Sequence, residues 1–547
     1  MDGYLIAGLA SLIYVAILLA GRRLGIWRKL NISLYGPVMI IKTTRGSRLV
    51  ERLARPGRCW AVYGRVAIFV TLTAAVGTTL FLVYLATNIG EGIETPESLP
   101  GQSIDLPPPG TLVLTIYVVF SFVVAIVLHE YAHGILSVVG KIRLTSMGVL
   151  MLVVPIGAFV EPDDKQLKAS SRSTRAGVYA AGPAANIFFA ILCFALLVGV
   201  VGPGATPVAS GAVVIDVAEN SPAAIYGIGP WSEVLSVEGQ LVRNGSQMSL
   251  VSFAVPGELV TVELLSESET RMMEVPGGVV AHTVFEGPGL DAGLEPGMIV
   301  KNLDDQPVNS ISEFRSITEN SSRTEPVNIT VLRFGEDPAT GMGGYFEDPT
   351  IRTINLTSKW LYYRTHYPWV NREQYRNVSY MAISASALGV WTEDPEFLTD
   401  VVADPLRSSD GGSIGARLER FISLPFIGYS PVVEPASDLY APSGVMSFIP
   451  GDIFWILLNT LYWLFWANLV LGLTNVLPAF PFDGGYVLRD AIRGAAHWWW
   501  QRLTGLDRAI GRKTASDAEV DAFMWFLSGM VILIMVYILV AGLWKGL

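Results

Sequence analysis

The segment His129-Glu130-Tyr131-Ala132-His133 has the residue types and the spacing of a hydrolytic zinc site. Residues four apart on a helix lie on one face about one turn apart, so two imidazoles can bind one ion while Glu130 lies beside it. A zinc ion held in this way activates water, and a neighbouring glutamate can accept the proton of that water. The segment therefore predicts metal-assisted hydrolysis.

These histidines end an apolar stretch that is long enough to span a membrane. Residues Thr111 to Leu128 carry no charge, and only four of their side chains hold a polar atom. A membrane-spanning helix needs about 20 such residues. Ionisable side chains within a membrane are costly and are by default functional. The sequence thus places a hydrolytic site inside the lipid bilayer.

The composition divides the chain between two compartments. Of its 547 residues 51 % are hydrophobic and 16 % charged, which is typical of a multi-pass membrane protein with room for soluble domains. Residues 203–452 hold 32 acidic and 14 basic residues, a net charge of −18, whereas the remainder holds 16 acidic and 24 basic residues, a net charge of +8. We expect the two parts to face different sides of the membrane.

Six apolar stretches predict six transmembrane helices. They run from about Tyr4 to Ala20, Val66 to Thr87, Thr111 to Val139, Gly177 to Val201, Phe454 to Leu477 and Phe523 to Leu543. Loops rich in Lys and Arg follow the first, third and fifth spans, and the positive-inside rule assigns them to the cytoplasm. His129 and His133 then lie in the cytoplasmic half of the third span, and the long acidic loop lies outside.

The segment Met147 to Val160 is apolar but too short for a helical span, and Gly148, Pro155 and Gly157 interrupt it. We expect a re-entrant hairpin or loop of β type, because irregular backbone at membrane depth must be buried in protein or line a wet cavity. An edge strand there is suited to accept an unwound substrate by β-addition.

Three further polar residues lie at the depth of the histidines. A catalytic zinc ion held by His129 and His133 needs a third protein ligand and an open position, and Asp483 is the only acid bordering the inner half of the fifth span. Asn186 and Asn475 are candidates to stabilise an oxyanion, and helix packing is the alternative role for Asn186. The other histidines, His282, His366 and His497, have no ligand spacing, and we expect them at the surface or at an interface.

A β-type pattern with Gly and Pro punctuation begins at Gly211. The segments 220–242 and 287–308 resemble each other, which predicts two copies of one small β-rich domain. We therefore divide the chain into an N-terminal membrane part with four spans (1–202), the two copies (211–277 and 278–358), an outer linker region without an assigned fold (359–452) and a C-terminal membrane part with two spans (453–547).

Together these motifs resemble the site-2 proteases, a family of intramembrane zinc metalloproteases. The resemblance rests on the HExxH segment, on Gly-Ala-Phe-Val-Glu161-Pro, on Gly-Pro-x-x-Asn ending at Asn186, and on Asn475-x-x-Pro-x-x-Pro-x-Asp-Gly-Gly. The two outer copies are similar to PDZ domains, although Pro230-Trp231-Ser232 stands where Pro-Gly-Asp is usual. The resemblance implies a mainly α multi-pass membrane protein with a re-entrant β-type segment and α+β PDZ-like domains outside the cytoplasm.

The resemblance also implies an activity. We expect a Zn²⁺-dependent endopeptidase of the cell membrane that cuts a single-span membrane protein within the bilayer, after another protease has shortened that substrate outside. We expect no nucleic-acid partner. Two other functions stay open: an inactive membrane scaffold that presents the PDZ-like domains, and a metal transporter. A transporter commonly has repeated halves around its ion site, and the spans show no such repeat.

Overall fold

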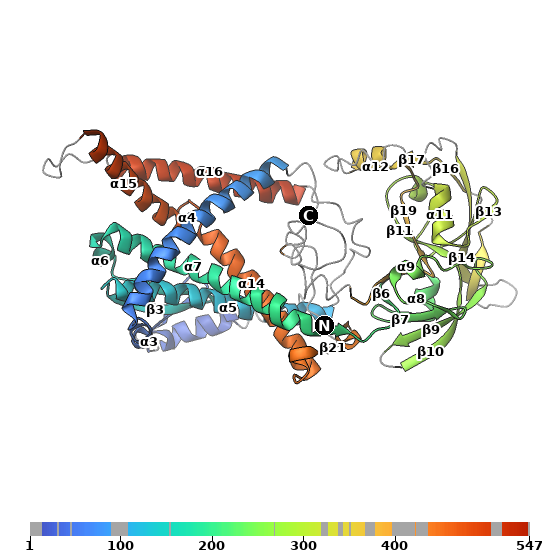
Figure 1. Cartoon of the computed structure of the whole chain (residues 1–547), viewed down its shortest axis with the longest axis horizontal. Coiled ribbons are helices and arrows are strands. Elements are labelled where there is room, and N and C mark those ends of the chain that lie inside the picture. The colour runs from blue at the N-terminus through green and yellow to red at the C-terminus, as the bar shows by residue number, and fades with distance from the viewer. Residues whose placement is uncertain are drawn as a thin grey trace. The chain divides into compact units, whose positions relative to one another are not determined.

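The computed structural model describes residues 14–29, 32–43, 46–88, 108–152, 155–266, 269–318, 326–336, 343–348, 352–366, 378–396, 422, 436–504 and 517–544. The chain forms two compact units (Figure 1). A helical unit comprises residues 1–89, 106–199 and 457–547, and a sheet-rich unit comprises residues 90–105 and 200–456.

The helical unit is built from long apolar helices. Its helices are α2 (Ile26–Lys29), α3 (Ser47–Leu53), α4 (Gly57–Asn88), α5 (Pro108–Val139), α6 (Asp164–Ala169), α7 (Arg172–Leu196), α14 (Gly451–Asn475), α15 (Asp483–Thr504) and α16 (Asp517–Trp544). Among the described residues, α4, α5, α7, α14 and α16 are long and apolar enough to cross a membrane. Five of the six expected spans therefore have such a helix. Of the first span, residues 14–20 are helical and the rest lies outside the described residues.

Helix α7 contacts α4, α5 and α15. Ser171 caps its start by accepting a hydrogen bond from Thr174 N, 3.2 Å away. Small side chains on α7, including Ala180 and Ala184, are fully buried, which lets neighbouring helices approach closely. The hydroxyl of Tyr63 on α4 donates to the carbonyl oxygen of Ala181 at 2.7 Å. Helix α7 is thus a shared packing surface for the helices of this unit.

A four-stranded antiparallel sheet completes the helical unit. Its strands follow the order β1 (Ile32–Tyr35), β2 (Val38–Thr43), β3 (Leu144–Met151) and β4 (Pro155–Pro162). The expected hairpin or loop at Met147 to Val160 is therefore an antiparallel β3–β4 hairpin, and its depth in the membrane stays a prediction. The sequence did not indicate β1 and β2, which extend this hairpin into a sheet. Strand β4 is left at the edge.

The sheet-rich unit contains two larger sheets. The first has the order β10-β9-β7-β6-β20 with β8 beside β7, and the second has the order β15-β14-β12-β11-β19 with β13 beside β12 and β16 beside β14. The strands are β5 (Ala205–Pro207), β6 (Ala212–Val217), β7 (Glu233–Val237), β8 (Gln240–Leu241), β9 (Leu259–Ser266), β10 (Glu269–Pro276), β11 (Val279–Val284), β12 (Ile299–Leu303), β13 (Gln306–Pro307), β14 (Val327–Glu336), β15 (Gly343–Glu347), β16 (Arg352–Ile354), β17 (Thr357–Ser358), β18 (Ser379–Tyr380), β19 (Ile383–Ala387), β20 (Val390–Glu393) and β21 (Tyr440–Pro442). Short helices accompany them: α8 (Pro222–Tyr226), α9 (Gly245–Met248), α10 (Pro288–Asp291), α11 (Ile311–Thr318) and α12 (Lys359–His366).

The expected repeat is visible as one succession of elements that occurs twice. A short helix, a strand, a tight turn, a two-residue strand and a second helix follow one another as α8, β7, β8, α9 and again as α10, β12, β13, α11. Trp231 has a φ of 67° where the second copy has Gly297 at 89°. A left-handed backbone at a bulky residue is rare, so the fold of the copy imposes it.

The β19–β20 segment joins the two copies into one unit. It lies in the region 359–452, to which the sequence analysis assigned no fold. Strand β19 pairs with β11 in the second sheet, whereas β20 pairs with β6 in the first. The turn between them places Gly389 at a φ of 83°, and a Cβ there would overlap the side chain of Ser221. One continuous hydrophobic core spans both sheets.

His282 bridges the two sheets, so of the two expected positions it occupies an interface within the protein and not the surface. The side chain is 4 % exposed. Its Nε2 lies 2.9 Å from Asp216 Oδ2 on β6, and its Nδ1 lies 2.9 Å from Ser386 Oγ on β19. Both ring nitrogens are satisfied within the core, which is a structural arrangement. The side chains of His366 and His497 lie outside the described residues.

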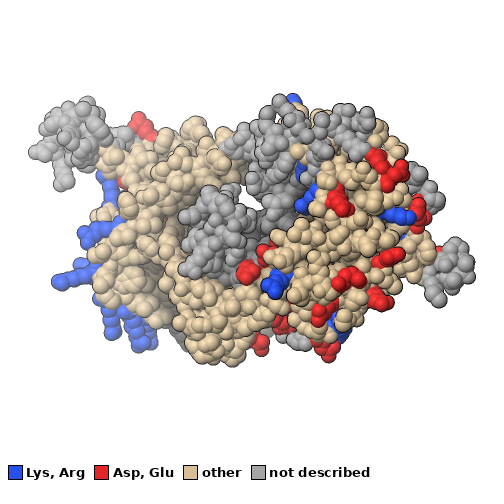
Figure 2. All heavy atoms as spheres, turned by 45° about the vertical axis from the view of Figure 1, so that its right-hand side comes forward, with Lys and Arg blue, Asp and Glu red and all other residues tan. Residues whose placement is uncertain are grey.

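Charged side chains are distributed differently on the two units. Figure 2 shows acidic side chains spread over the surface of the sheet-rich unit. On the helical unit, basic side chains gather at one end. This distribution follows the division of net charge in the sequence.

Candidate metal centre

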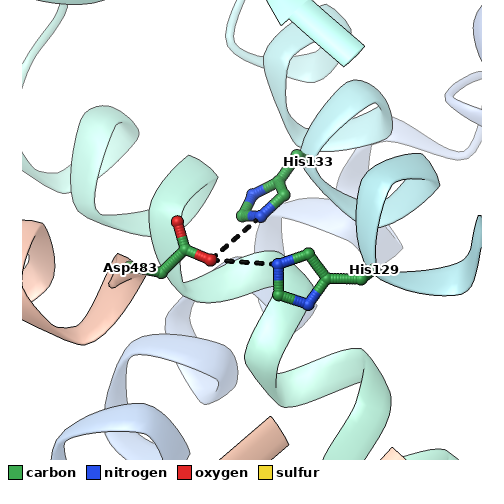
Figure 3. A group of neighbouring side chains, drawn as sticks. All are labelled: His129, His133 and Asp483. Carbon is green, nitrogen blue, oxygen red and sulfur yellow. Dashed lines mark hydrogen bonds and ion pairs between the residues drawn. The ribbon is translucent and has the colours of Figure 1, made fainter. Parts of the chain in front are cut away.

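Helix α5 presents the two histidines on one face, as their spacing predicts. Their ring centroids lie 4.7 Å apart with an angle of 75° between the planes. Asp483, from the start of α15, points into the space between them (Figure 3). Its Oδ2 lies 3.0 Å from Nε2 of His129 and 3.2 Å from Nε2 of His133. The structure therefore brings together all three predicted metal ligands.

The two glycines after Asp483 allow the turn that delivers it. A Cβ on Gly484 would overlap the carbonyl group of Val476, and a Cβ on Gly485 would lie 2.7 Å from the carbonyl oxygen of Ala479. Helix α15 can therefore start directly after the turn that follows α14 only if both residues lack a side chain. The Asp-Gly-Gly sequence is explained by this close packing.

The hydrogen bonding of His133 prepares its Nε2 for a metal. Its Nδ1 lies 2.7 Å from the carbonyl oxygen of Val178 on α7, which can only accept, so Nδ1 carries the proton. Nε2 then has a free lone pair directed at the site. A partner of this kind fixes the orientation and the tautomer of metal-binding histidines.

Gly182 on α7 forms the wall of the site. A Cβ at this position would lie 2.6 Å from Nε2 of His129 and closer still to Nε2 of His133. Any side chain would therefore occupy the space that the two imidazoles face. In the sequence Gly182 is marked only as part of the Gly-Pro-x-x-Asn motif, and the structure gives it a specific steric role.

The arrangement fits a zinc ion. The ligand atoms of His129, His133 and Asp483 all lie within 4.8 Å of one another. Ligands about 2.0–2.1 Å from a tetrahedral ion lie roughly 3.3 Å from each other, close to the 3.0 and 3.2 Å found here. Two imidazole nitrogens and one carboxylate oxygen form a ligand set used by catalytic zinc.

Glu130 lies beside this cluster and contacts the sheet. Its Oε2 accepts a hydrogen bond from the backbone N–H of Val160 at 2.8 Å. Val160 belongs to β4, the edge strand, so this N–H points away from the neighbouring strand β3. The free edge of β4 is thereby positioned next to the predicted proton acceptor.

The two asparagines differ in how their side chains are engaged. Asn186 is fully buried one turn beyond Gly182, and neither of its side-chain polar atoms has a hydrogen-bond partner among the described residues. The side-chain amide of Asn475 donates to Leu471 O in its own helix at 3.0 Å. Asn186 is therefore the better candidate for contact with a substrate.

The site has the features of a metallohydrolase centre in a membrane protein. It lies among helices long enough to span a membrane, and it combines two histidines one turn apart with a carboxylate from another helix and an adjacent glutamate. The family model "Peptidase family M50" matches residues 117–499 of this chain. The chain therefore belongs to peptidase family M50, the site-2 protease family of zinc metalloproteases.

Curated relatives match smaller parts of the chain. An uncharacterized protein of Methanocaldococcus jannaschii is 27 % identical over 170 residues, which are 31 % of this chain and 45 % of that protein. A "Probable periplasmic serine endoprotease DegP-like" of Pseudomonas putida GB-1 is 26 % identical over 171 residues, 23 % of this chain and 36 % of the relative. The chain thus spans less than half the length of these relatives. The DegP-like match is consistent with inserted PDZ-like domains.

Proposed function

We propose that this protein is a zinc-dependent endopeptidase of the site-2 type, which hydrolyses a peptide bond in or near the transmembrane helix of a membrane-anchored substrate. The observation that carries the proposal is the convergence of His129, His133 and Asp483 beside Glu130. A zinc ion bound there would supply Lewis-acid activation of water and of the scissile carbonyl group.

Glu130 acts as the proton carrier. Its carboxylate accepts a proton from the attacking water and delivers it to the amine that leaves when the C–N bond breaks. The hydrogen bond from Val160 N holds the carboxylate beside the cluster, so the protein orients the base before substrate arrives. This role needs no further acid near the metal ligands.

Strand β4 receives the substrate. A helical substrate hides its carbonyl groups in internal hydrogen bonds, so the cut segment must unwind and adopt an extended form. The edge of β4 offers backbone groups for pairing with such a segment. Since this edge also contacts Glu130 through Val160, pairing would bring the scissile bond to the proposed base.

Asn186 is the proposed donor to the developing oxyanion. An amide with no hydrogen-bond partner in the described structure is costly in an apolar interior, and such a group is often kept for function. Asn475 stays a second candidate, because its amide would have to leave the Leu471 carbonyl first.

Basic residues support a cytoplasmic position for the metal-binding end. Arg58 lies where α4 begins, Lys141 follows the end of α5, Arg172 starts α7, and Arg489 follows α14 in α15. The positive-inside rule assigns these ends to the cytoplasm, and the acidic sheet-rich unit then lies outside.

We propose a single-span substrate, shortened outside by another protease, as the partner.

Cleavage by purified protein tests the function. Wild-type protein in detergent is incubated with single-span proteins, with and without a zinc chelator, and the products are mapped by mass spectrometry. We expect a cut within or next to the apolar segment of the substrate, and we expect the chelator to abolish this cleavage. Zinc binding without cleavage would instead favour the scaffold, and zinc flux into proteoliposomes would favour the transporter.

A further inference from the structure

The third metal ligand lies on a different helix from the histidines, so the helix that carries it must be held in register. Asp483 is the first residue of α15, and the histidines pack against α7 at Gly182. Besides the turn after α14, the packing of α15 on α7 contributes to the distance between the carboxylate and the imidazoles. An error well under 1 Å matters at a metal site.

One shared neighbour and two direct contacts connect these helices at matching intervals. At the first, Gly182 and Asp483 both face the histidine pair. At the second, Tyr179 stacks on Tyr486 with ring centroids 4.7 Å apart and an angle of 16°. The third is an ion pair between Arg175 and Asp490. The contact residues lie three and then four positions apart on each helix, so each set lies on one helical face.

The ion pair has the geometry of a clamp. Arg175 Nε donates to Asp490 Oδ2 at 2.7 Å, and its Nη2 donates to Asp490 Oδ1 at 2.8 Å. The side chains are 11 % and 1 % exposed. A bidentate contact of this kind fixes both distance and angle, and removing one partner of a buried pair leaves an uncompensated charge.

We propose that Arg175 and Asp490 are positioning residues that set Asp483 over the histidines. Neither touches the ligands: they act by holding α15 on α7 two turns away from the site. The inference rests on the proposed zinc site, but it does not require proteolysis.

Metal binding tests this role directly. Zinc affinity is measured by chelator competition on purified protein in detergent, and the visible spectrum of the cobalt(II)-substituted protein reports the ligand geometry. Asp490→Asn and Arg175→Ala should each lower zinc affinity about tenfold or more, which is the size of effect seen when a residue that supports a metal ligand is replaced. Both should also alter the cobalt spectrum, and the double variant should be no worse than the poorer single variant.

A second ion pair on the same helix provides the control. Arg493 Nη2 lies 3.0 Å from Asp521 Oδ1 and connects α15 to α16. Asp521→Asn makes the same chemical change as Asp490→Asn away from the α7 contact. It should leave zinc affinity and the cobalt spectrum unchanged.

Excess zinc separates positioning from general damage. A misplaced ligand weakens binding, so saturating zinc should restore most of the cleavage activity of Asp490→Asn by mass action. If Arg175→Ala does not fold, Arg175→Lys keeps the cation without the two-point contact and should be intermediate. If folded Asp490→Asn protein had wild-type zinc affinity and a wild-type cobalt spectrum, the inference would be overturned while the proposed function would stand. A wild-type protein that binds no zinc would overturn the proposed function together with the inference.

Discussion

Asp483 Oδ2 lies 3.0 Å from Nε2 of His129, although 354 positions separate the two residues in the chain. The larger part of the sheet-rich unit, residues 200–456, lies between them in sequence. The contact therefore depends on helix packing within the helical unit. The N-terminal membrane part contributes the two histidines, and the C-terminal membrane part contributes the carboxylate.

Removing either part of this contact should remove the metal. Asp483→Ala or His129→Ala deletes a ligand, and we expect zinc affinity to fall by more than about a hundredfold, beyond the 10–100-fold typical of losing a residue behind a ligand. Chelator competition measures it. Unchanged affinity in Asp483→Ala would show that another residue is the third ligand.

A methyl group at residue 182 should also displace the metal. Gly182→Ala places a carbon 2.6 Å from Nε2 of His129, so we expect at least a tenfold loss of zinc affinity, about 1.4 kcal/mol. Gly199→Ala is the matched control, because a Cβ there meets nothing within 4 Å. Equal zinc affinity in both variants would contradict the steric role of Gly182.

The convergence of His129, His133 and Asp483 could be predicted from sequence, because a zinc site of this kind requires two histidines four positions apart and a third ligand at the same depth. His129 and His133 are one helical turn apart, and Asp483 was the only acid in reach. The places of β2 and β20 in their sheets could not be predicted, since each pairs with a strand more than 100 positions away. The roles of Gly182 and Arg175 depend on the approach of two helices, which the sequence of either helix alone does not indicate. The available signal was that residues 175, 179 and 182 have the same spacings as residues 490, 486 and 483.

The stability of the sheet-rich unit should depend on Glu393. Burial raises the pKa of this carboxyl to about 7, and the carboxylate of Asp394 adds to the rise. A raised pKa favours the protonated form in the folded state, so this stabilisation is present below the ordinary value of 4.5 and is lost as pH rises through about 7. Hydrogen exchange at β20 should therefore quicken over that range in the full chain. Glu393→Gln should flatten the change, and an identical pH profile in that variant would contradict the assignment.

Asp216 should give the sheet-rich unit a pH dependence of stability opposite to that caused by Glu393. The hydrogen bond from His282 lowers the pKa of Asp216, so its stabilisation is present above the ordinary carboxyl range and is lost as acid protonates it. Asp216→Asn should reduce protection of β6 and β11 at neutral pH and make it less sensitive to acid. Wild-type exchange rates in this variant would show that the His282 bridge does not hold the two sheets together.

The sheet-rich unit should control access and not chemistry. Strands β5 and β21 pair, with Val208 N donating to Leu439 O at 2.9 Å, so residues 209–438 can be replaced by a short linker. We expect the shortened protein to cleave a pre-trimmed substrate at nearly the wild-type rate and an untrimmed substrate faster than wild type. Loss of cleavage of the short substrate in folded, zinc-loaded protein would make the unit a required part of the enzyme.

Zinc and Glu130 should together hydrolyse a peptide bond of a membrane-anchored protein. Glu130→Gln keeps the three metal ligands but cannot accept the proton, so kcat/KM should fall by at least about 10²–10⁴-fold. The decisive measurement is zinc content and single-span substrate cleavage in the same preparation of wild-type and Glu130→Gln protein. We expect equal zinc in both and cleavage only in the wild type; cleavage by zinc-loaded Glu130→Gln protein at the wild-type rate would rule out this role of Glu130.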